Sequence, residues 1–269
     1  MKVHNARTEG PQDSPFFRIW MCGPFRVEWA VDGKYEEVPV SAWKGRRSPR
    51  LLLKALLCNQ RRQAQRNVLA EQLWPDLLPL YQRREFSGAT TRLRTVLHSC
   101  GHKRLFIIEH DSQCYRLEGQ AFLWVDADAA LELLDQVEQV GRTTQHALPL
   151  LQQAAAYFDR GSLLEGDEWA WVRKHRLSLD AAHYRCRLWL AETYAQHKMF
   201  GQAQDILHAL LKEDPGDEDV LRRLMEVLDQ QYMPHQALKV FEETHLLLQR
   251  SHRSFSPALI TYAESLKHA

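Results

Sequence analysis

The sequence lacks long apolar runs, a cysteine framework and a secretory leader. No unbroken apolar stretch is longer than five residues, as at Ala121–Val125, so no transmembrane helix is predicted. Met1–Pro15 is polar, contains Gly10, Pro11 and Pro15, and predicts a flexible tail rather than a signal peptide. Five scattered cysteines in 269 residues are too few for a disulfide framework, and their odd number indicates reduced thiols. We therefore expect a cytoplasmic protein with no membrane partner.

The common enzyme motifs are also missing. The sequence contains no G-x-S-x-G, G-x-G-x-x-G, P-loop or H-E-x-x-H pattern. A small acidic cluster, Glu165, Asp167 and Glu168, lies beside Trp169 and Trp171. Paired carboxylates perform acid–base chemistry only in a pocket that separates their pKa values, so we interpret the cluster as a solvated loop between helices. We expect no enzymatic activity and no catalytic residue.

One group of residues has the side chains of a metal site, but its spacing does not match a known zinc finger. The group is His98, Cys100, His102, His110 and Cys114. A helix end capped by Gly101 explains the residues from His98 to His102 without a metal. We therefore expect no cofactor. Three other cysteines lie in apolar patterns and are expected in the core: Cys22, Cys58 and Cys186.

The net charge of +1 conceals two opposed halves. Residues 1–118 contain 20 Lys+Arg and 12 Asp+Glu, a net of +8; residues 119–269 contain 15 and 22, a net of −7. Residues 41–104 alone contain 14 basic and 3 acidic residues, a net of +11. Such a field attracts polyanions, and it coincides with a change in secondary-structure pattern. Nucleic-acid binding is therefore favoured over a merely solvated surface.

The N-terminal pattern predicts a small antiparallel sheet followed by three helices and a hairpin. Period-two alternation predicts strands over 17–21, 25–31 and 35–40, with Asp32-Gly33 as a hairpin turn. Helices are predicted from Ser48-Pro49, over Val68–Leu73, and over about Arg84–Ser99. Residues 105–110 and 113–117 then predict a final hairpin. This order is that of a winged helix, an α+β fold with a leading sheet.

The predicted third helix has one apolar face, formed by Phe86, Ala89, Leu93, Val96 and Leu97. Its other face carries hydroxyls and arginines, which suit base edges in the major groove. The candidate base-reading residues are Ser87, Gly88, Thr91, Arg92, Arg94 and Thr95. The candidate phosphate and wing contacts are Arg46, Arg47, Arg66, Arg83, Arg84, Arg104, Ser112, Gln113 and Arg116.

The chain from Val125 onward has helical periodicity throughout, and its last third contains a repeat. Four positions recur at an offset of 34 residues: Leu190, Tyr194, Ala203 and Leu207 match Leu224, Leu228, Ala237 and Phe241. This offset is the tetratricopeptide period, in which a small residue lets paired helices approach closely. An all-α array of this kind usually serves binding.

From about Phe16 to its end, the chain resembles the SARP-type transcriptional regulators. The resemblance is carried by short motifs in a specific order: Cys22-Gly23-Pro24-Phe25, Arg50–Leu57, Leu73-Trp74-Pro75, Arg92–Leu97, Cys114–Leu117, Asp126, Trp171 with Arg173, Asp214-Pro215, Glu218, Leu224-Met225, Ala237-Leu238 and Phe241. The sequence departs from the family at Ser112-Gln113-Cys114, at Tyr232-Met233-Pro234, and before Ser256-Pro257.

The resemblance implies an OmpR-like winged helix over 16–119 and a bacterial transcriptional activation domain of tetratricopeptide-like helices over 120–269. It implies an activator that binds promoter direct repeats in double-stranded DNA as a homodimer and contacts RNA polymerase through the helical domain. The alternative function is a helical scaffold whose basic half binds RNA or an acidic protein. A small effector could also bind between the helices of the second domain, although no motif identifies one.

Overall fold

The computed structural model describes residues 16–43, 47–99, 106–110, 113–119, 122–250 and 253–267, which form two compact units. The N-terminal unit comprises the described residues up to Ala129 together with Arg160–Ser178. The helical unit comprises Ala130–Asp159 and the described residues from Leu179 onward. The chain thus leaves the N-terminal unit after Ala129 and returns to it at Arg160. None of the described helices combines the length and the apolar character needed to cross a bilayer.

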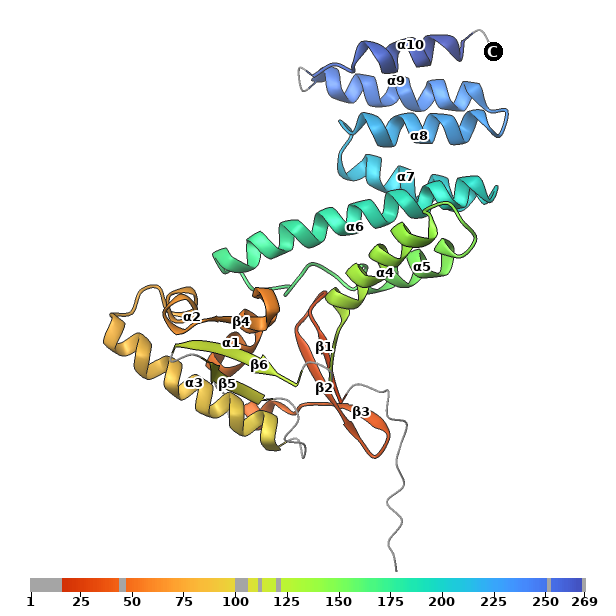
Figure 1. Cartoon of the computed structure of the whole chain (residues 1–269). Coiled ribbons are helices and arrows are strands. Elements are labelled where there is room, and N and C mark those ends of the chain that lie inside the picture. The colour runs from red at the N-terminus through yellow and green to blue at the C-terminus, as the bar shows by residue number, and fades with distance from the viewer. Residues whose placement is uncertain are drawn as a thin grey trace, which may run out of the picture. The chain divides into compact units, whose positions relative to one another are not determined.

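The N-terminal unit begins with a four-stranded sheet in the order β3-β2-β1-β7 (Figure 1). Its strands are β1 (Phe17–Trp20), β2 (Arg26–Val31), β3 (Lys34–Glu37) and β7 (Leu123–Val125). The first three are antiparallel, as predicted, and Asp32 and Gly33 of the turn have φ of 47° and 78°. Strand β7 pairs with β1 in parallel and was not predicted.

The third strand is shorter than the predicted 35–40. It ends at Glu37, and Val40–Trp43 form a single 3-10 turn. The reason is Pro39, which has no N–H to donate to a continuing ladder.

Three helices follow, at the predicted places: α1 (Arg47–Cys58), α2 (Arg66–Leu73) and α3 (Pro79–Ser99). The third is longer than predicted, because it begins at Pro79 rather than near Arg84. Proline suits a first helical position, where its missing N–H would have no intrahelical partner. A second sheet in the order β4-β6-β5 contains β4 (Gln63–Gln65), β5 (Phe106–His110) and β6 (Cys114–Glu118). The pair β5–β6 lies where the hairpin was predicted, whereas β4 was not predicted.

The segment Arg160–Ser178 is bound to the end of β1 by backbone hydrogen bonds. The Gly23 N–H donates to the Ser162 carbonyl (2.9 Å), and the Leu164 N–H donates to the Met21 carbonyl (2.7 Å). Gly23 has a φ of 78°, and a Cβ there would lie 2.5 Å from the Arg160 carbonyl oxygen. Only glycine therefore permits this approach.

The acidic cluster in this segment is solvated only in part: Glu165 and Glu168 are exposed, but Asp167 is half-buried, which corrects the sequence interpretation for that residue. The Lys54 ammonium of α1 donates to the Asp167 carboxylate, and both side chains are largely buried. The Arg176 guanidinium donates to the main-chain carbonyls of Leu163, Leu164 and Asp167. The loop is ordered because the N-terminal unit supplies cations and N–H groups that its oxygens need.

Asp126 joins the start of helix α4 (Asp126–Val140) to the residues that follow β1. Its buried carboxylate accepts hydrogen bonds from the N–H groups of Met21 (2.7 Å), Cys22 (3.0 Å) and Ala127 (2.8 Å). Burial raises the pKa of Asp126 above its ordinary value, and the three N–H donors oppose that rise.

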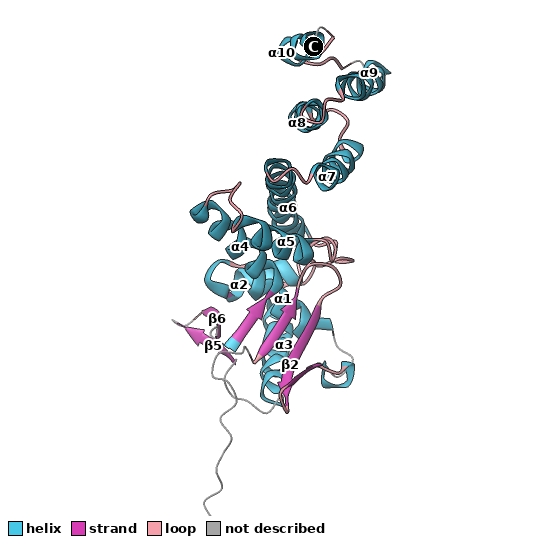
Figure 2. Ribbon diagram, turned by 90° about the vertical axis from the view of Figure 1, so that its right-hand side faces the viewer, coloured by secondary structure: helices cyan, strands magenta, loops and turns pink. Residues whose placement is uncertain are grey.

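Among the described residues that follow, seven helices occur: α4 (Asp126–Val140), α5 (Ala147–Phe158), α6 (Ala170–Gln196), α7 (Phe200–Glu213), α8 (Glu218–Asp229), α9 (Pro234–Arg250) and α10 (Pro257–Ser265). The helices α7 to α10 stack in chain order, as Figure 2 shows end-on. The 34-residue repeat corresponds to two helix pairs, α6–α7 and α8–α9. The helical-repeat prediction is therefore confirmed.

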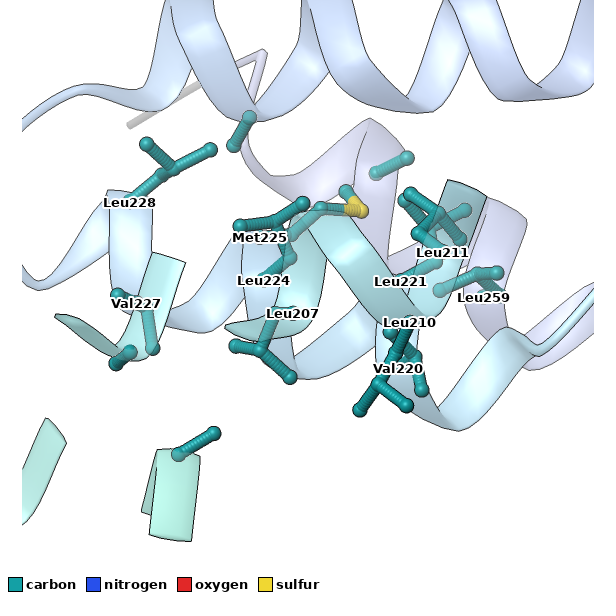
Figure 3. Packing of buried hydrophobic residues seen from close by; sticks show 14 of the residues in the cluster. Leu207, Leu210, Leu211, Val220, Leu221, Leu224, Met225, Val227, Leu228 and Leu259 are labelled. Atoms are coloured by element: carbon teal, nitrogen blue, oxygen red, sulfur yellow. The ribbon is translucent and has the colours of Figure 1, made fainter. Parts of the chain in front are cut away.

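Leucines and other apolar residues from the facing sides of these helices form the core of the helical unit. Figure 3 shows Leu207 and Leu210 of α7 beside Leu221 and Leu224 of α8, all at most 3% exposed. Each such side chain contributes roughly 1.5–3 kcal/mol by leaving water. Asp217 caps α8 by accepting the N–H groups of Asp219 and Val220.

Candidate nucleic-acid interface

Helix α3 is fixed in rotation by its apolar face. The five residues predicted for that face are at most 3% exposed: Phe86, Ala89, Leu93, Val96 and Leu97. The Phe86 ring packs edge-on against Tyr115 of β6, with centroids 4.7 Å apart. Thr90, which the sequence interpretation overlooked, is also buried, and its hydroxyl donates to the Phe86 carbonyl (2.9 Å). The opposite face of α3 consequently turns away from the core of its unit.

The six candidate base-reading residues lie outside this apolar face. Ser87, Thr91 and Thr95 are exposed, and Gly88, Arg92 and Arg94 are half-buried. At 100° per residue, Thr91 and Thr95 lie opposite Leu93, whereas Arg92 and Arg94 lie on opposite flanks. The Thr95 hydroxyl donates to the Thr91 carbonyl (3.0 Å), which leaves its oxygen able to accept.

Arg92 folds back along its own helix over Gly88. A Cβ on Gly88 would lie 3.2 Å from Arg92 Nη1 and 3.6 Å from its Cζ. Among the described residues no ion pair joins Arg92 to Glu85, the carboxylate that would otherwise compete for it. A small hollow beside Arg92 is lined by Ala42, Trp43, Thr95 and Val96. The Arg92 guanidinium therefore lies within contact distance of where a side chain at position 88 would begin.

The candidate phosphate contacts fall into three groups. Arg47, Arg83, Arg84 and Gln113 are exposed, and Arg66 is half-buried at the start of α2. The Arg66 N–H donates to the Gln113 carbonyl (2.8 Å), which places these two residues side by side.

Arg116 is half-buried on β6 and forms an ion pair with Glu118, so part of its charge is neutralised within the hairpin. Arg46, Arg104 and Ser112 lie outside the described residues.

Helix α3 is positively charged, and one of its arginines lies at the centre of its exposed face. The helix contains four arginines and one acidic residue, Glu85, a net of +3. Arg84, assigned to phosphate from the sequence, lies about 180° from Leu93 and so shares the centre of the exposed face with Thr91. The sequence pattern does not place Arg84 on this face, because the helix that it predicts begins only at about Arg84.

Before and at the start of α3 lies an exposed apolar cluster that the sequence interpretation also missed. It comprises Leu77, Leu78, Leu80 and Tyr81, of which Leu78 is 68% and Leu80 74% exposed. Contiguous exposed apolar residues of this kind commonly mark a protein-contact surface. The signal in the sequence was the run of leucines around Pro75 and Pro79.

No group of three or more potential metal ligands occurs within the part of the chain that the structure describes. Cys100 and His102 of the suspected metal motif lie outside it. Burial raises the thiol pKa of Cys22 above its ordinary value, and that of Cys58 and Cys186 to about 12. Cys22 and Cys186 are core residues, as predicted, and Cys58 is half-buried.

A small-sheet unit with an exposed basic helix, followed by stacked helix pairs, is the architecture of SARP-type transcriptional regulators. Residues 125–262 match the family model of the bacterial transcriptional activator domain. This match covers 138 of 269 residues, just over half, and the chain belongs to that family. The predicted resemblance to SARP-type activators is thereby confirmed. Members of this family are regulators rather than enzymes.

The fold is similar to that of Mycobacterium tuberculosis EmbR, in a structure of its complex with a low-affinity phosphopeptide. The TM-score is 0.77 at 18% sequence identity, over 94% of this chain and 65% of the EmbR chain. The chain thus spans slightly less than two thirds of EmbR, and identity at this level demonstrates the fold alone. A search of curated proteins found no significant match.

Proposed function

We propose that the chain is a sequence-specific DNA-binding transcription activator and that its N-terminal unit is an OmpR-like winged helix. In this proposal α3 enters the major groove, and β5 and β6 form the wing. Ser87, Thr91, Arg92, Arg94 and Thr95 contact base edges, with Gly88 permitting close approach. Arg84 joins them at the centre of the face.

The single observation that carries the proposal is the division of α3 into two faces. All five apolar side chains of one face are buried, and the other face carries hydroxyls and arginines. The helix as a whole has a net charge of +3. A surface helix that only needed solubility would gain from mixed charges and i,i+4 pairs instead. The net charge of +8 over residues 1–118 supports an anionic partner.

Phosphate contacts fix the register of the helix in the groove. We assign this role to Arg46, Arg47, Arg66, Arg83, Arg104, Ser112, Gln113 and Arg116. Arg66 and Gln113, from two different elements, are adjacent and so suit a shared phosphate.

Two copies on direct repeats, about 10–11 base pairs apart, would place both recognition helices on one side of the duplex. Each copy raises the effective concentration of the other, so affinity increases without a new DNA contact. A footprint at saturating protein tests this arrangement: two adjacent protected half-sites are expected, and protection of one half-site contradicts it.

The helical unit is assigned to protein partners, RNA polymerase and a second copy of the chain. Residues 119–269 have a net charge of −7, which disfavours DNA, and stacked helix pairs offer extended binding surfaces. The exposed Leu77–Tyr81 cluster supplies a further apolar contact on the N-terminal unit.

The proposal is tested by a mobility shift with the promoter region of the chain's own gene and a random duplex of equal length, both at fixed salt. Specific binding requires the promoter duplex to shift at a much lower protein concentration than the random one. Equal binding to both duplexes would remove the sequence-specific function. Tighter binding to a single-stranded RNA of equal length would favour the alternative, a scaffold whose basic half binds RNA.

A further inference from the structure

The helical unit contains a pocket of about 320 Å³ lined mainly by α6 and α8, together with Leu207 of α7 and Thr143 of the segment between α4 and α5. Its apolar lining comprises Ala191 and Ala195 of α6, Leu207 of α7 and Val227 of α8. Leu207 and Val227 can be found in Figure 3. Small residues on α6 leave the space that a larger side chain would fill, and the volume lies within the range of small-molecule sites.

Some polar groups that line this pocket already have partners, and others do not. Arg223 pairs with the Glu192 carboxylate and donates through Nε to Asp219 (3.0 Å), so two carboxylates already neutralise it. Gln196 and Gln230 form no side-chain hydrogen bond with any other described residue. Two amides therefore remain available for a ligand.

The charges that line the pocket sum to −1, from Glu192, Glu226 and Arg223. Glu226 has one weak ion pair, 3.9 Å from Arg222 Nη1, on a side chain that is 44% exposed. An entering anion would meet two carboxylates and an arginine that is already paired. An entering cation would meet an incompletely compensated carboxylate in a partly desolvated site, where such attraction is stronger than in water.

We propose that this pocket binds a small organic cation, an ammonium or guanidinium group carried on a short apolar stem. The stem contacts Ala195, Leu207 and Val227, and the cationic group lies near Glu226 with the amides of Gln196 and Gln230 as additional partners. The site is independent of whether the N-terminal unit binds DNA.

The test uses the full chain without DNA and three probes of one chain length: 1,4-diaminobutane, 1,4-butanediol and succinate. Isothermal titration is expected to show saturable one-to-one binding of the diamine, at least tenfold tighter than of the diol or succinate. Binding of succinate as tightly as the diamine, or binding of none of the three, overturns the proposal.

Two variants place the binding in this pocket. Glu226→Gln brings the lining charge to zero and is expected to weaken diamine binding at least tenfold, and Ala195→Leu is expected to abolish it by filling the space. Glu243→Gln makes the same charge change on the exposed surface of α9 and is the matched control. Thermal melts establish that each variant is folded. Unchanged affinity in Glu226→Gln, or an equal loss in Glu243→Gln, contradicts the assignment.

Discussion

The side chains of α3 differ in what they can recognise, even though they share one exposed face. Thr91 lies at the centre of that face, and Arg92 lies on a flank, over Gly88. Arg47 stands on another element, at the start of α1, and is exposed. In the proposed function the first two contact base edges, whereas Arg47 contacts a phosphate.

We predict that Thr91→Ala or Arg92→Ala costs about 1–3 kcal/mol of binding on the cognate site and much less on random duplex. Arg47→Ala should weaken both complexes equally and lower the salt slope by roughly one, because one fewer counterion is released. Arg250→Ala, on the exposed end of α9, controls for the loss of an arginine as such. Unchanged cognate preference in Arg92→Ala would remove the groove assignment.

Two glycines with the same backbone angle allow the cost of backbone strain to be compared with the cost of a steric clash. Gly23 and Gly33 both have a φ of 78°, but only at Gly23 does an added Cβ meet another atom, the Arg160 carbonyl oxygen at 2.5 Å. We predict that Gly33→Ala costs about 1–2 kcal/mol, the penalty of the left-handed angle. Gly23→Ala should cost at least ~1 kcal/mol more, measured by urea unfolding. Equal losses would mean that the segment carrying Arg160 moves aside freely.

The buried thiols predict a dependence of stability on pH. Burial raises the pKa of Cys186 from 9.0 to about 12. Between these values the unfolded thiol ionises while the folded one does not, so the free energy of unfolding falls as pH rises. At pH 10 the loss is roughly 1 kcal/mol for this thiol. Urea unfolding at pH 7 and pH 10 should show that loss in the natural chain and a correspondingly smaller one in Cys186→Ala; equal losses would contradict the buried thiol's role.

At the scale of the element, α3 retains a glycine where helix stability would favour alanine. Gly88 lies in the middle of the helix, and its missing side chain leaves room for the Arg92 guanidinium. We predict that Gly88→Ala stabilises the chain by about 0.5–1 kcal/mol but displaces Arg92 and lowers the preference for the cognate site. Urea unfolding and the mobility shift measure the two effects.

Gly201→Ala is the matched control, since Gly201 also lies in a helix and has open space around it. It should leave DNA preference unchanged. A Gly88→Ala variant with unaltered DNA preference would show that Arg92 is not positioned by the gap at Gly88.

Hydrophobic periodicity predicted the elements that are long enough for the pattern to recur several times. The apolar face of α3 and the two helix pairs of the repeat were predicted because their buried residues recur over several turns. Strands β4 and β7 have three residues each, too few to display alternation, and their pairing partners lie far away in the sequence. The candidate base-reading face followed from the same periodicity, whereas the position of Arg92 over Gly88 depends on a rotamer that no spacing encodes.

At the scale of the whole molecule, the sequence predicts one division near residue 119, and the contacts among the described residues also group Arg160–Ser178 with the N-terminal unit. Hydrophobic patterns report on neighbours along the chain and cannot show that Arg160–Ser178 returns to β1. The ion pair between Lys54 and Asp167 joins residues that are 113 positions apart. A lysine or an aspartate in the sequence does not show which distant residue it will contact.

We predict that a chain ending at Gly119 lacks a cooperative thermal transition and binds no promoter duplex specifically. It has lost β7, the Asp126 carboxylate and the docked segment, so the backbone donors of Met21 and Cys22 are left without their acceptors. A chain ending at Ser178 retains every segment of the N-terminal unit and should melt cooperatively. Circular dichroism during heating distinguishes the two. A cooperative melt of the shorter chain would show that residues 16–119 fold alone.

The interrupted unit also sets an order of events during synthesis. At roughly 5–20 residues per second, Ser178 leaves the peptidyl-transferase centre about 3–12 seconds after Gly119. Until Arg160–Ser178 has emerged and docked, we expect the N-terminal unit to be incomplete and α3 to stay open to proteases. Stalled ribosome complexes of increasing length should therefore become protease-resistant in the α3 region only once Arg160–Ser178 has emerged. The return of this short segment thus delays completion of the N-terminal unit until residues 130–159 of the helical unit have also been made.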